Sequence, residues 1–226
     1  MKLSRDVYVA NTCELQCLGC ELAPYVVYPK ANTHTRVYDI YGGNPLGSEA
    51  ALQYIQTLVK QDKQIRLWTH GHITYETFVT LKPYIHTWCF YAPSCDEHEY
   101  RTHVGNQEFN DCVAFLDQVK ADKVRYAVHI AVTKENIIRL PDDMRFIRQK
   151  KYPCWIHYDK TQFTIDEQNS IHYFERYGDI LVLPLRKGYP EGSCRVPLGQ
   201  GFSLQWRLLV ARYRSWKAKL KTRWEV

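Results

Sequence analysis

The chain has 226 residues, enough for one domain with a substantial hydrophobic core. Hydrophobic residues make up 45% and charged residues 24%, a balance that excludes a disordered or fibrous protein. No apolar run of about 18 residues occurs, so we expect no membrane-spanning helix. The N-terminal MKLSRDVYVAN has no apolar stretch of secretory length, so we expect no secretory leader. Eight cysteines in such a chain favour a reducing, cytoplasmic location over a disulfide framework.

Strand-like and helix-like stretches alternate along most of the chain. Helix-compatible stretches lie at 48–61, 74–82, 107–120, the polar segment up to 150, and 166–176. This alternation predicts parallel strands with crossover helices. Six or seven such units are too few for a closed eightfold barrel, so we expect an open or partial α/β barrel. The strands are expected at 7–10, 36–41, 65–69, 87–92, 124–132, 154–158 and 179–185, the last at a sheet edge because it contains Pro184.

Three cysteines follow the first expected strand. Cys13, Cys17 and Cys20 form a C-x3-C-x2-C pattern within eight residues. Thiolates are soft ligands for iron–sulfur clusters, zinc and copper. Three of them can hold three irons of a [4Fe–4S] cluster, which ordinarily takes four cysteines. The fourth iron would then be open to a substrate or cofactor.

A glycine-rich segment follows the second expected strand, with Gly42, Gly43, Asn44 and Pro45 in a row. Two glycines let the backbone approach a ligand closely, and the proline stiffens the turn that follows. In a parallel sheet both loops leave the carboxyl ends of neighbouring strands, where active residues collect. We therefore expect the cysteine loop and Gly42–Pro45 on one rim.

The cysteine spacing and the Gly42–Pro45 segment together resemble the radical S-adenosylmethionine (radical SAM) enzymes. The resemblance implies a partial (β/α)6-type barrel, with a [4Fe–4S] cluster on the three cysteines and S-adenosylmethionine on the fourth iron. Gly42–Pro45 would grip the methionine amino group. Two departures from the family pattern are Gly19, where a bulky residue is usual, and Asn44, which replaces an acidic residue. The resemblance also implies reductive cleavage of the cofactor, hydrogen abstraction from a substrate, and flavodoxin or ferredoxin as electron donor.

Polar residues after other strands are further rim candidates. Thr69 and Ser94 are the predicted cofactor-binding residues, Ser94 at the ribose by resemblance. The strand-borne His129 and His157 are expected to be hydrogen-bonded structural residues. Cys154 is a weaker hydrogen-atom donor candidate, because it begins its strand at the end opposite the rim. The remaining rim candidates are His70, Thr133, Asp159, Lys160 and Arg186.

The C-terminal segment carries the charge. The last 20 residues hold seven Lys and Arg against one Glu, an excess that equals the net charge of +6 of the whole chain. We expect residues 1–190 to form the barrel core and 191–226 a loop and a basic amphipathic helix. That helix either covers the open side of the barrel or binds an anionic partner such as nucleic acid, with a membrane surface as a third option. Its apolar stripe consists of Trp206, Leu209, Val210, Tyr213, Trp216, Leu220 and Trp224.

The expected function is a radical SAM enzyme that acts on a nucleotide, a nucleic-acid base or another small metabolite. An activase of a glycyl-radical enzyme, similar to that of anaerobic ribonucleotide reductase, is the second reading, favoured by Gly19 and the Gly42–Leu46 stretch. A third reading is a non-catalytic zinc module in which His34 is the fourth ligand beside the three cysteines.

Overall fold

The computed structural model describes residues 4–13, 15, 26–70, 73–104, 109–177, 179–185 and 213. Seven strands in these ranges form one parallel sheet whose spatial order is the order of the sequence, β1 to β7. The strands are β1 (Ser4–Ala10), β2 (Val37–Gly42), β3 (Gln64–Thr69), β4 (Thr87–Tyr91), β5 (Tyr126–Val132), β6 (Cys154–Asp159) and β7 (Ile180–Leu185).

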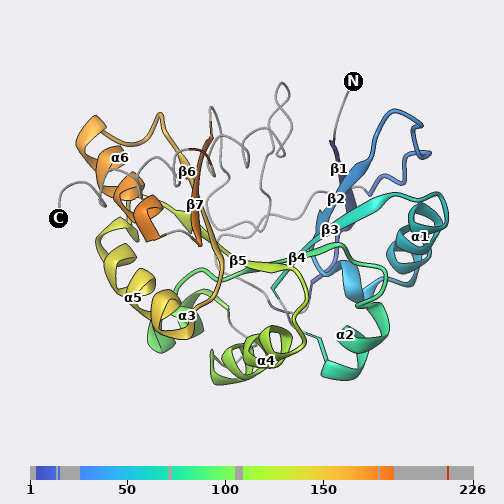
Figure 1. The fold of residues 1–226 in the computed structure, drawn as a ribbon, viewed down its shortest axis with the longest axis horizontal. Coiled ribbons are helices and arrows are strands. Elements are labelled where there is room, and N and C mark those ends of the chain that lie inside the picture. Colours follow the sequence, from blue (N-terminus) through green and yellow to red (C-terminus); the bar gives the residue numbers. More distant parts are fainter. Residues whose placement is uncertain are drawn as a thin grey trace.

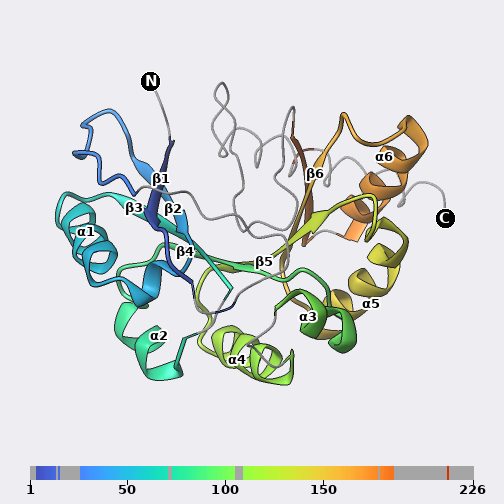
Figure 2. The same ribbon diagram turned by 180° about the vertical axis from the view of Figure 1, so that it is seen from behind.

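The helices lie on the outer, convex side of the curved sheet. Figures 1 and 2 show this from front and back, with α1 beside β1–β3 and α5 and α6 beside β6. The helices of the described residues are α1 (Glu49–Lys60), α2 (Tyr75–Leu81), α3 (Glu97–His103), α4 (Phe109–Ala121), α5 (Leu140–Lys150) and α6 (Ile165–His172), with short 3-10 turns η1 (Pro45–Gly47), η2 (Ile137–Arg139) and η3 (Tyr173–Tyr177).

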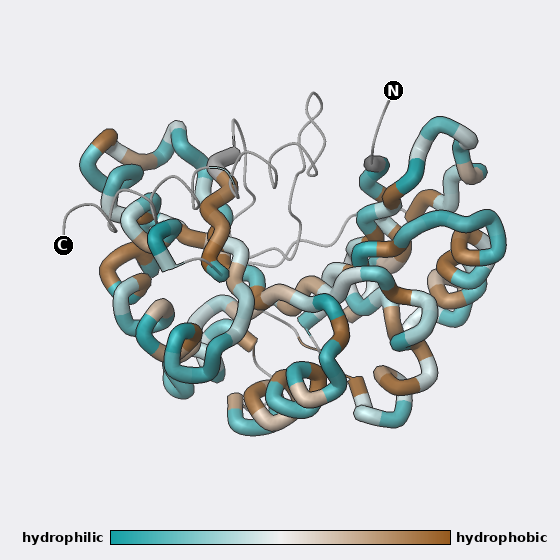
Figure 3. Tube along the Cα trace, viewed as in Figure 1, coloured by the Kyte–Doolittle hydropathy of each residue, from teal (hydrophilic) through white to brown (hydrophobic). Residues whose placement is uncertain are grey.

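Successive strand residues alternate between two faces of the sheet. The outer face joins the helices in the main core, where Ile40, Phe90 and Ile156 pack in one cluster with Leu58 of α1 and Ile147 of α5. The helices change between hydrophobic and hydrophilic residues along their length, as expected for helices with one face on a sheet (Figure 3). The inner face has a smaller cluster of its own, formed by Tyr41, Trp68, Cys89, Ala127, Trp155, Leu181 and Leu183.

The predicted partial barrel with parallel strands is confirmed, and β7 ends the sheet order as Pro184 predicted. One helix was missed: α3 lies inside a polar stretch that has no apolar period. The predicted boundary at residue 190 and the C-terminal helix lie outside the described residues, apart from Tyr213. In the described ranges, no helix is both long enough and apolar enough to cross a membrane.

Candidate cofactor site at the carboxyl ends of the strands

The loops after β1 and β2 are joined by backbone hydrogen bonds. The Gly43 N–H donates to the Ala10 carbonyl at 2.7 Å, and the Asn44 N–H donates to the Thr12 carbonyl at 2.7 Å. Ala10 and Thr12 lead directly into Cys13, which is half-buried at this rim. The glycine segment therefore fixes the start of the cysteine loop, and the structure brings the two predicted motifs together.

Both glycines are required by this close approach. Gly42 has φ +153°, and a Cβ there would lie 2.5 Å from the Ala10 oxygen. A Cβ on Gly43 would overlap the Thr12 carbonyl oxygen. These glycines make room for the chain segment that carries Cys13, and their predicted approach to a ligand stays a prediction.

Asn44 and Pro45 build the turn that follows. The Asn44 Oδ1 accepts a hydrogen bond from the Leu46 N–H at 3.1 Å and so caps η1, whose first residue is the buried Pro45. Asn44 thus forms the turn that follows β2, and its contact with the cofactor stays a prediction.

Thr69 ends β3 at the same level as this segment. The register places Ala10 beside Gly42 and Ile40 beside Leu67, which brings Thr69 level with Gly42. Thr69 is buried, and the neighbouring His70 packs edge-on against Tyr91, with 4.9 Å between the ring centres. Three adjacent strands therefore contribute predicted residues to one part of the rim.

Ser94 follows β4 and is tied to the helix layer. Its hydroxyl donates to Asp143 Oδ1 of α5 at 3.1 Å and accepts from the Asp96 N–H at 3.1 Å. The Cys95 N–H donates to the same carboxylate oxygen at 2.6 Å. Burial raises the pKa of Asp143 to about 6, against the effect of these two hydrogen bonds. The predicted ribose contact of Ser94 stays a prediction.

The other rim candidates are spread over distant strands. Asp159 Oδ1 accepts from the N–H and the hydroxyl of Thr161, at 2.9 and 2.7 Å, in the turn after β6. Thr133 exchanges hydrogen bonds with Asn136 in the turn after β5. Lys160 is exposed. These residues stabilise turns, and Arg186 lies outside the described residues, as do Cys17 and Cys20.

Below the rim, the inner face carries rings at close spacing. His129 lies 4.2 Å from His157, 5.3 Å from Trp68 and 5.5 Å from Tyr91, measured between ring centres. His129 is fully buried, and within the described part of the chain neither ring nitrogen has a hydrogen-bond partner. The expectation of a hydrogen-bonded structural histidine is therefore wrong for His129. Burial, reinforced by His70, lowers its pKa to about 3, so its ring is neutral at physiological pH.

An ion pair lies deeper on the same face. Arg66 of β3 binds Asp39 of β2 through two hydrogen bonds, Nε to Oδ1 at 2.7 Å and Nη2 to Oδ2 at 2.6 Å. The Trp68 indole N–H also donates to Asp39 Oδ1 at 3.2 Å. Both charged residues are buried, and each neutralises the other. The sequence analysis missed this pair, although a charged residue inside an apolar strand was visible in both VYDIY and IRLW.

No protein-family model and no curated protein sequence matches this chain. Solved structures share its fold. Methylornithine synthase (PylB) superposes with a TM-score of 0.63 at 14% identity, over 95% of this chain and 69% of that one. Streptococcus suis SuiB bound to S-adenosylmethionine gives 0.62 at 13%, over 82% and 51%. His-tagged anSMEcpe with bound AdoMet gives 0.55 at 14%, over 70% and 49%.

These three neighbours are radical SAM enzymes. The chain has the radical SAM fold. It spans about half the length of the SuiB and anSMEcpe chains, at 51% and 49%. The resemblance first drawn from two short motifs is thus confirmed at the level of the fold.

The structure also locates Cys154, the weaker hydrogen-atom donor candidate. This residue lies on the outer face of β6 in the main core, fully buried, and burial raises its thiol pKa far above the ordinary value. It faces the helices and not the inner face of the barrel. The idea that Cys154 donates a hydrogen atom inside the barrel is therefore wrong.

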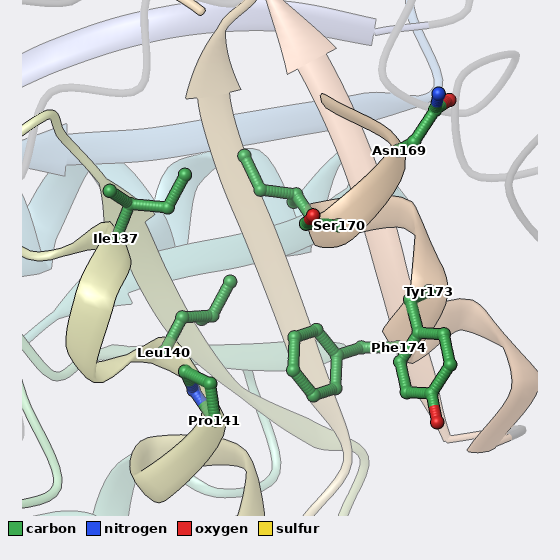
Figure 4. A pocket seen from close by; sticks show the side chains of 8 residues that line it. Ile137, Leu140, Pro141, Asn169, Ser170, Tyr173 and Phe174 are labelled. Atoms are coloured by element: carbon green, nitrogen blue, oxygen red, sulfur yellow. The ribbon is translucent and has the colours of Figure 1, made fainter. Parts of the chain in front are cut away.

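A groove of about 520 Å³ lies on the helix side of the fold. Ile137 and Leu140 line it from η2 and α5, and Tyr173 and Phe174 line it from η3 (Figure 4). None of the predicted site residues lines this groove. We therefore place the candidate site at the rim.

Among the described residues, no group of three or more His, Cys, Asp and Glu side chains is arranged to hold a metal ion. Two of the three predicted cysteine ligands lie outside those residues. Cys13 nevertheless fits a cluster ligand, because its soft thiol stands half-buried at the rim beside the glycine segment. His34, the fourth ligand of the zinc reading, is exposed.

Proposed function

We propose that this protein is a radical SAM enzyme that binds a [4Fe–4S] cluster through Cys13, Cys17 and Cys20. The observation that carries the proposal is the hydrogen-bonded junction of the Cys13 and Gly42–Pro45 loops at the rim of a radical SAM fold. Two solved structures with this fold, SuiB and anSMEcpe, contain bound S-adenosylmethionine. When bound, the cluster and S-adenosylmethionine supply reductive cleavage and hydrogen abstraction.

In this proposal, the protein's own residues bind and orient S-adenosylmethionine. Gly42–Pro45 and Thr69 lie at one level of the rim and would hold S-adenosylmethionine, with the Asn44 side-chain oxygen as the proposed acceptor for its amino group. Ser94 belongs to the next loop along the rim. Below them, Trp68 packs on Trp155 and Tyr91 packs on His129, and these buried rings would help to exclude water from the reacting groups.

The substrate is a small molecule in our first reading, as a nucleotide, a base or another metabolite. A peptide is the second reading, because SuiB has been solved with its precursor peptide SuiA and anSMEcpe with the Cp18Cys peptide. A flavodoxin or ferredoxin as electron donor, and an anionic partner such as nucleic acid at residues 205–226, remain predictions from the sequence.

Anaerobic reconstitution with iron and sulfide tests the proposal. We expect about four irons per chain and formation of 5′-deoxyadenosine when S-adenosylmethionine and a reductant are added. Cys13→Ala should lose both iron and product, since three thiolates are needed to hold the cluster. Cys112→Ala is the matched control, because Cys112 is buried in the main core and should keep both. One zinc and no iron per chain would overturn the proposal in favour of the zinc module.

A further inference from the structure

Asp143 of α5 is a buried carboxylate that contacts a loop almost 50 residues earlier in the chain. Asp143 is only 3% exposed. Its Oδ1 accepts from the Ser94 hydroxyl at 3.1 Å and from the Cys95 N–H at 2.6 Å. No Lys or Arg of the described residues forms an ion pair with it. Burying a carboxylate without a paired cation costs folding free energy. The contacts that Asp143 makes to the loop therefore need an explanation.

The loop of residues 92–96 is held at both ends as well. The Ala92 N–H donates to the His129 carbonyl of β5 at 2.9 Å. At the other end, Asp96 Oδ1 accepts from the Glu99 N–H at 3.0 Å and caps α3. Asp143 contacts Ser94 and Cys95 between these anchors, and without it the middle of the loop would lose these hydrogen bonds to the helix layer.

This loop follows β4 at the rim, where the candidate cofactor site lies. The hydroxyl proton of Ser94 is already donated to Asp143, and one of its lone pairs accepts from the Asp96 N–H. Ser94 therefore has no proton left to donate to a ligand in this arrangement. Its hydroxyl holds the loop together with Asp143.

We propose that Asp143 is a positioning residue for S-adenosylmethionine, acting through Ser94 and Cys95 to fix the 92–96 loop at the rim. This inference rests on the proposed function. The hydrogen bonds require an acceptor oxygen at the Oδ1 position and not a charge. Asparagine can supply that oxygen, whereas alanine cannot.

The test measures the dissociation constant of S-adenosylmethionine by equilibrium dialysis on the full chain after anaerobic reconstitution. We expect Asp143→Ala to weaken binding about tenfold, a loss of about 1.4 kcal/mol. Asp143→Asn should stay within about twofold of the wild type, since one hydrogen-bonding oxygen is retained. At saturating S-adenosylmethionine the 5′-deoxyadenosine yield should be unchanged, so that the effect falls on KM and not on kcat.

A double-mutant cycle separates loop positioning from a direct Ser94 contact. Ser94→Ala and Asp143→Ala break the same link, so we expect the double variant to bind no more weakly than Asp143→Ala alone. Additive losses would mean that Ser94 contacts S-adenosylmethionine independently, and would overturn the inference. Asp142→Ala is the matched control, because the Asp142 carboxylate is 69% exposed and pairs with Arg145.

Iron content and melting temperature are measured for every variant. If Asp143→Ala does not fold, Asp143→Glu takes its place, because it keeps the charge but moves the oxygens by one methylene and should also weaken binding. Unchanged binding by Asp143→Ala, or by Asp143→Glu in its place, with full iron content would overturn this inference alone. A wild-type protein with about four irons that binds no S-adenosylmethionine would instead overturn the proposed function, and this inference with it.

Discussion

The two glycines after β2 are required by the chain's own packing. Gly42 and Gly43 lie against the backbone of Ala10 and Thr12, and both approaches leave no room for a Cβ. The hydrogen bonds from Gly43 and Asn44 to that backbone hold the start of the cysteine loop. In the proposed function, the glycine segment would act on the cluster through the position of Cys13.

Gly43→Ala is expected to disrupt this junction. Its Cβ would overlap the Thr12 carbonyl and lie 3.2 Å from the Cys13 Cβ, so one of the two loops must move. We expect the variant to incorporate less than half the wild-type iron, and its melting temperature to fall. Iron analysis and thermal unfolding after identical reconstitution measure the two effects.

Gly47→Ala is the control for this experiment. A Cβ at Gly47 would meet only the side chain of Asn44, at 3.1 Å from Nδ2, and that side chain can shift. Iron content should stay at the wild-type level. Equal iron content in Gly43→Ala would show that the glycine segment does not position the cysteine loop.

At the scale of elements, the positions of the strands were predictable, but the contacts on each face of the sheet were only partly predictable. All seven strands lie within three residues of their expected bounds, because each is a run of apolar residues between polar turns. The alternation within those runs assigns Asp39 and Arg66 to one face, but it does not show that they pair. Pairing depends on the register of β2 and β3, which crossover connections leave open.

The rim positions of the candidate residues were predicted where they depend on local sequence, and contacts that depend on packing were missed. The two rim motifs follow directly from strand ends. The missed α3 begins at the cap Asp96, a signal present in the sequence, but its seven residues include only one buried apolar side chain, Tyr100. Asp143 could not be found, because its partners lie 48 and 49 residues away and the contact follows from the arrangement of α5 and the β4–α3 loop.

The ion pair between β2 and β3 gives a prediction for these elements. Asp39→Asn would leave the Arg66 guanidinium buried without its counter-charge, and we expect a loss of about 3 kcal/mol in the free energy of unfolding. Replacing both residues, as Asp39→Leu with Arg66→Met, should restore most of this loss because no charge stays buried. Urea unfolding of the three proteins measures the difference.

The exposed pair of Arg145 and Asp142 serves as the reference for this series. Both side chains are 69% exposed, so Arg145→Met should change the free energy of unfolding by about 0.5 kcal/mol or less. A loss of the same small size in Asp39→Asn would mean that water reaches Arg66, and that the inner face is more open than its burial indicates.

For the whole molecule, the sheet separates two chemically different interiors. The outer layer between sheet and helices is apolar and holds Cys95, Cys112 and Cys154 as inert thiols, since burial raises the pKa of each. The inner face carries the Asp39–Arg66 pair and the ring cluster around His129. Asp143 on the helix side has a raised pKa, and His129 on the inner face has a lowered one.

These two groups act in opposite directions on stability. The folded pKa of His129 lies at about 3, below its ordinary value of 6.5, so the unfolded chain binds the proton first and stability is lost as pH falls below 6.5. The folded pKa of Asp143 lies at about 6, above its ordinary value of 3.8, so the folded chain holds the proton longer and stability is lost as pH rises from 3.8 to 6. Between about pH 3.8 and 6 the two groups change the free energy of unfolding with opposite slopes, each at most about 1.4 kcal/mol per pH unit.

Two variants should therefore reveal pH dependences of stability that cancel each other in the wild type. Relative to wild type, His129→Phe is expected to gain stability as pH falls from 6.5 to 5, because it removes the buried ring that cannot take a proton. Asp143→Asn should gain stability relative to wild type as pH rises from 5 to 6, because it removes the buried charge. Urea unfolding of reconstituted protein across pH 5 to 7.5 gives both curves, and other titrating groups cancel in the differences. If all three curves were parallel, both groups would have to exchange protons as easily in the folded protein as in the unfolded chain, and neither interior would exclude water.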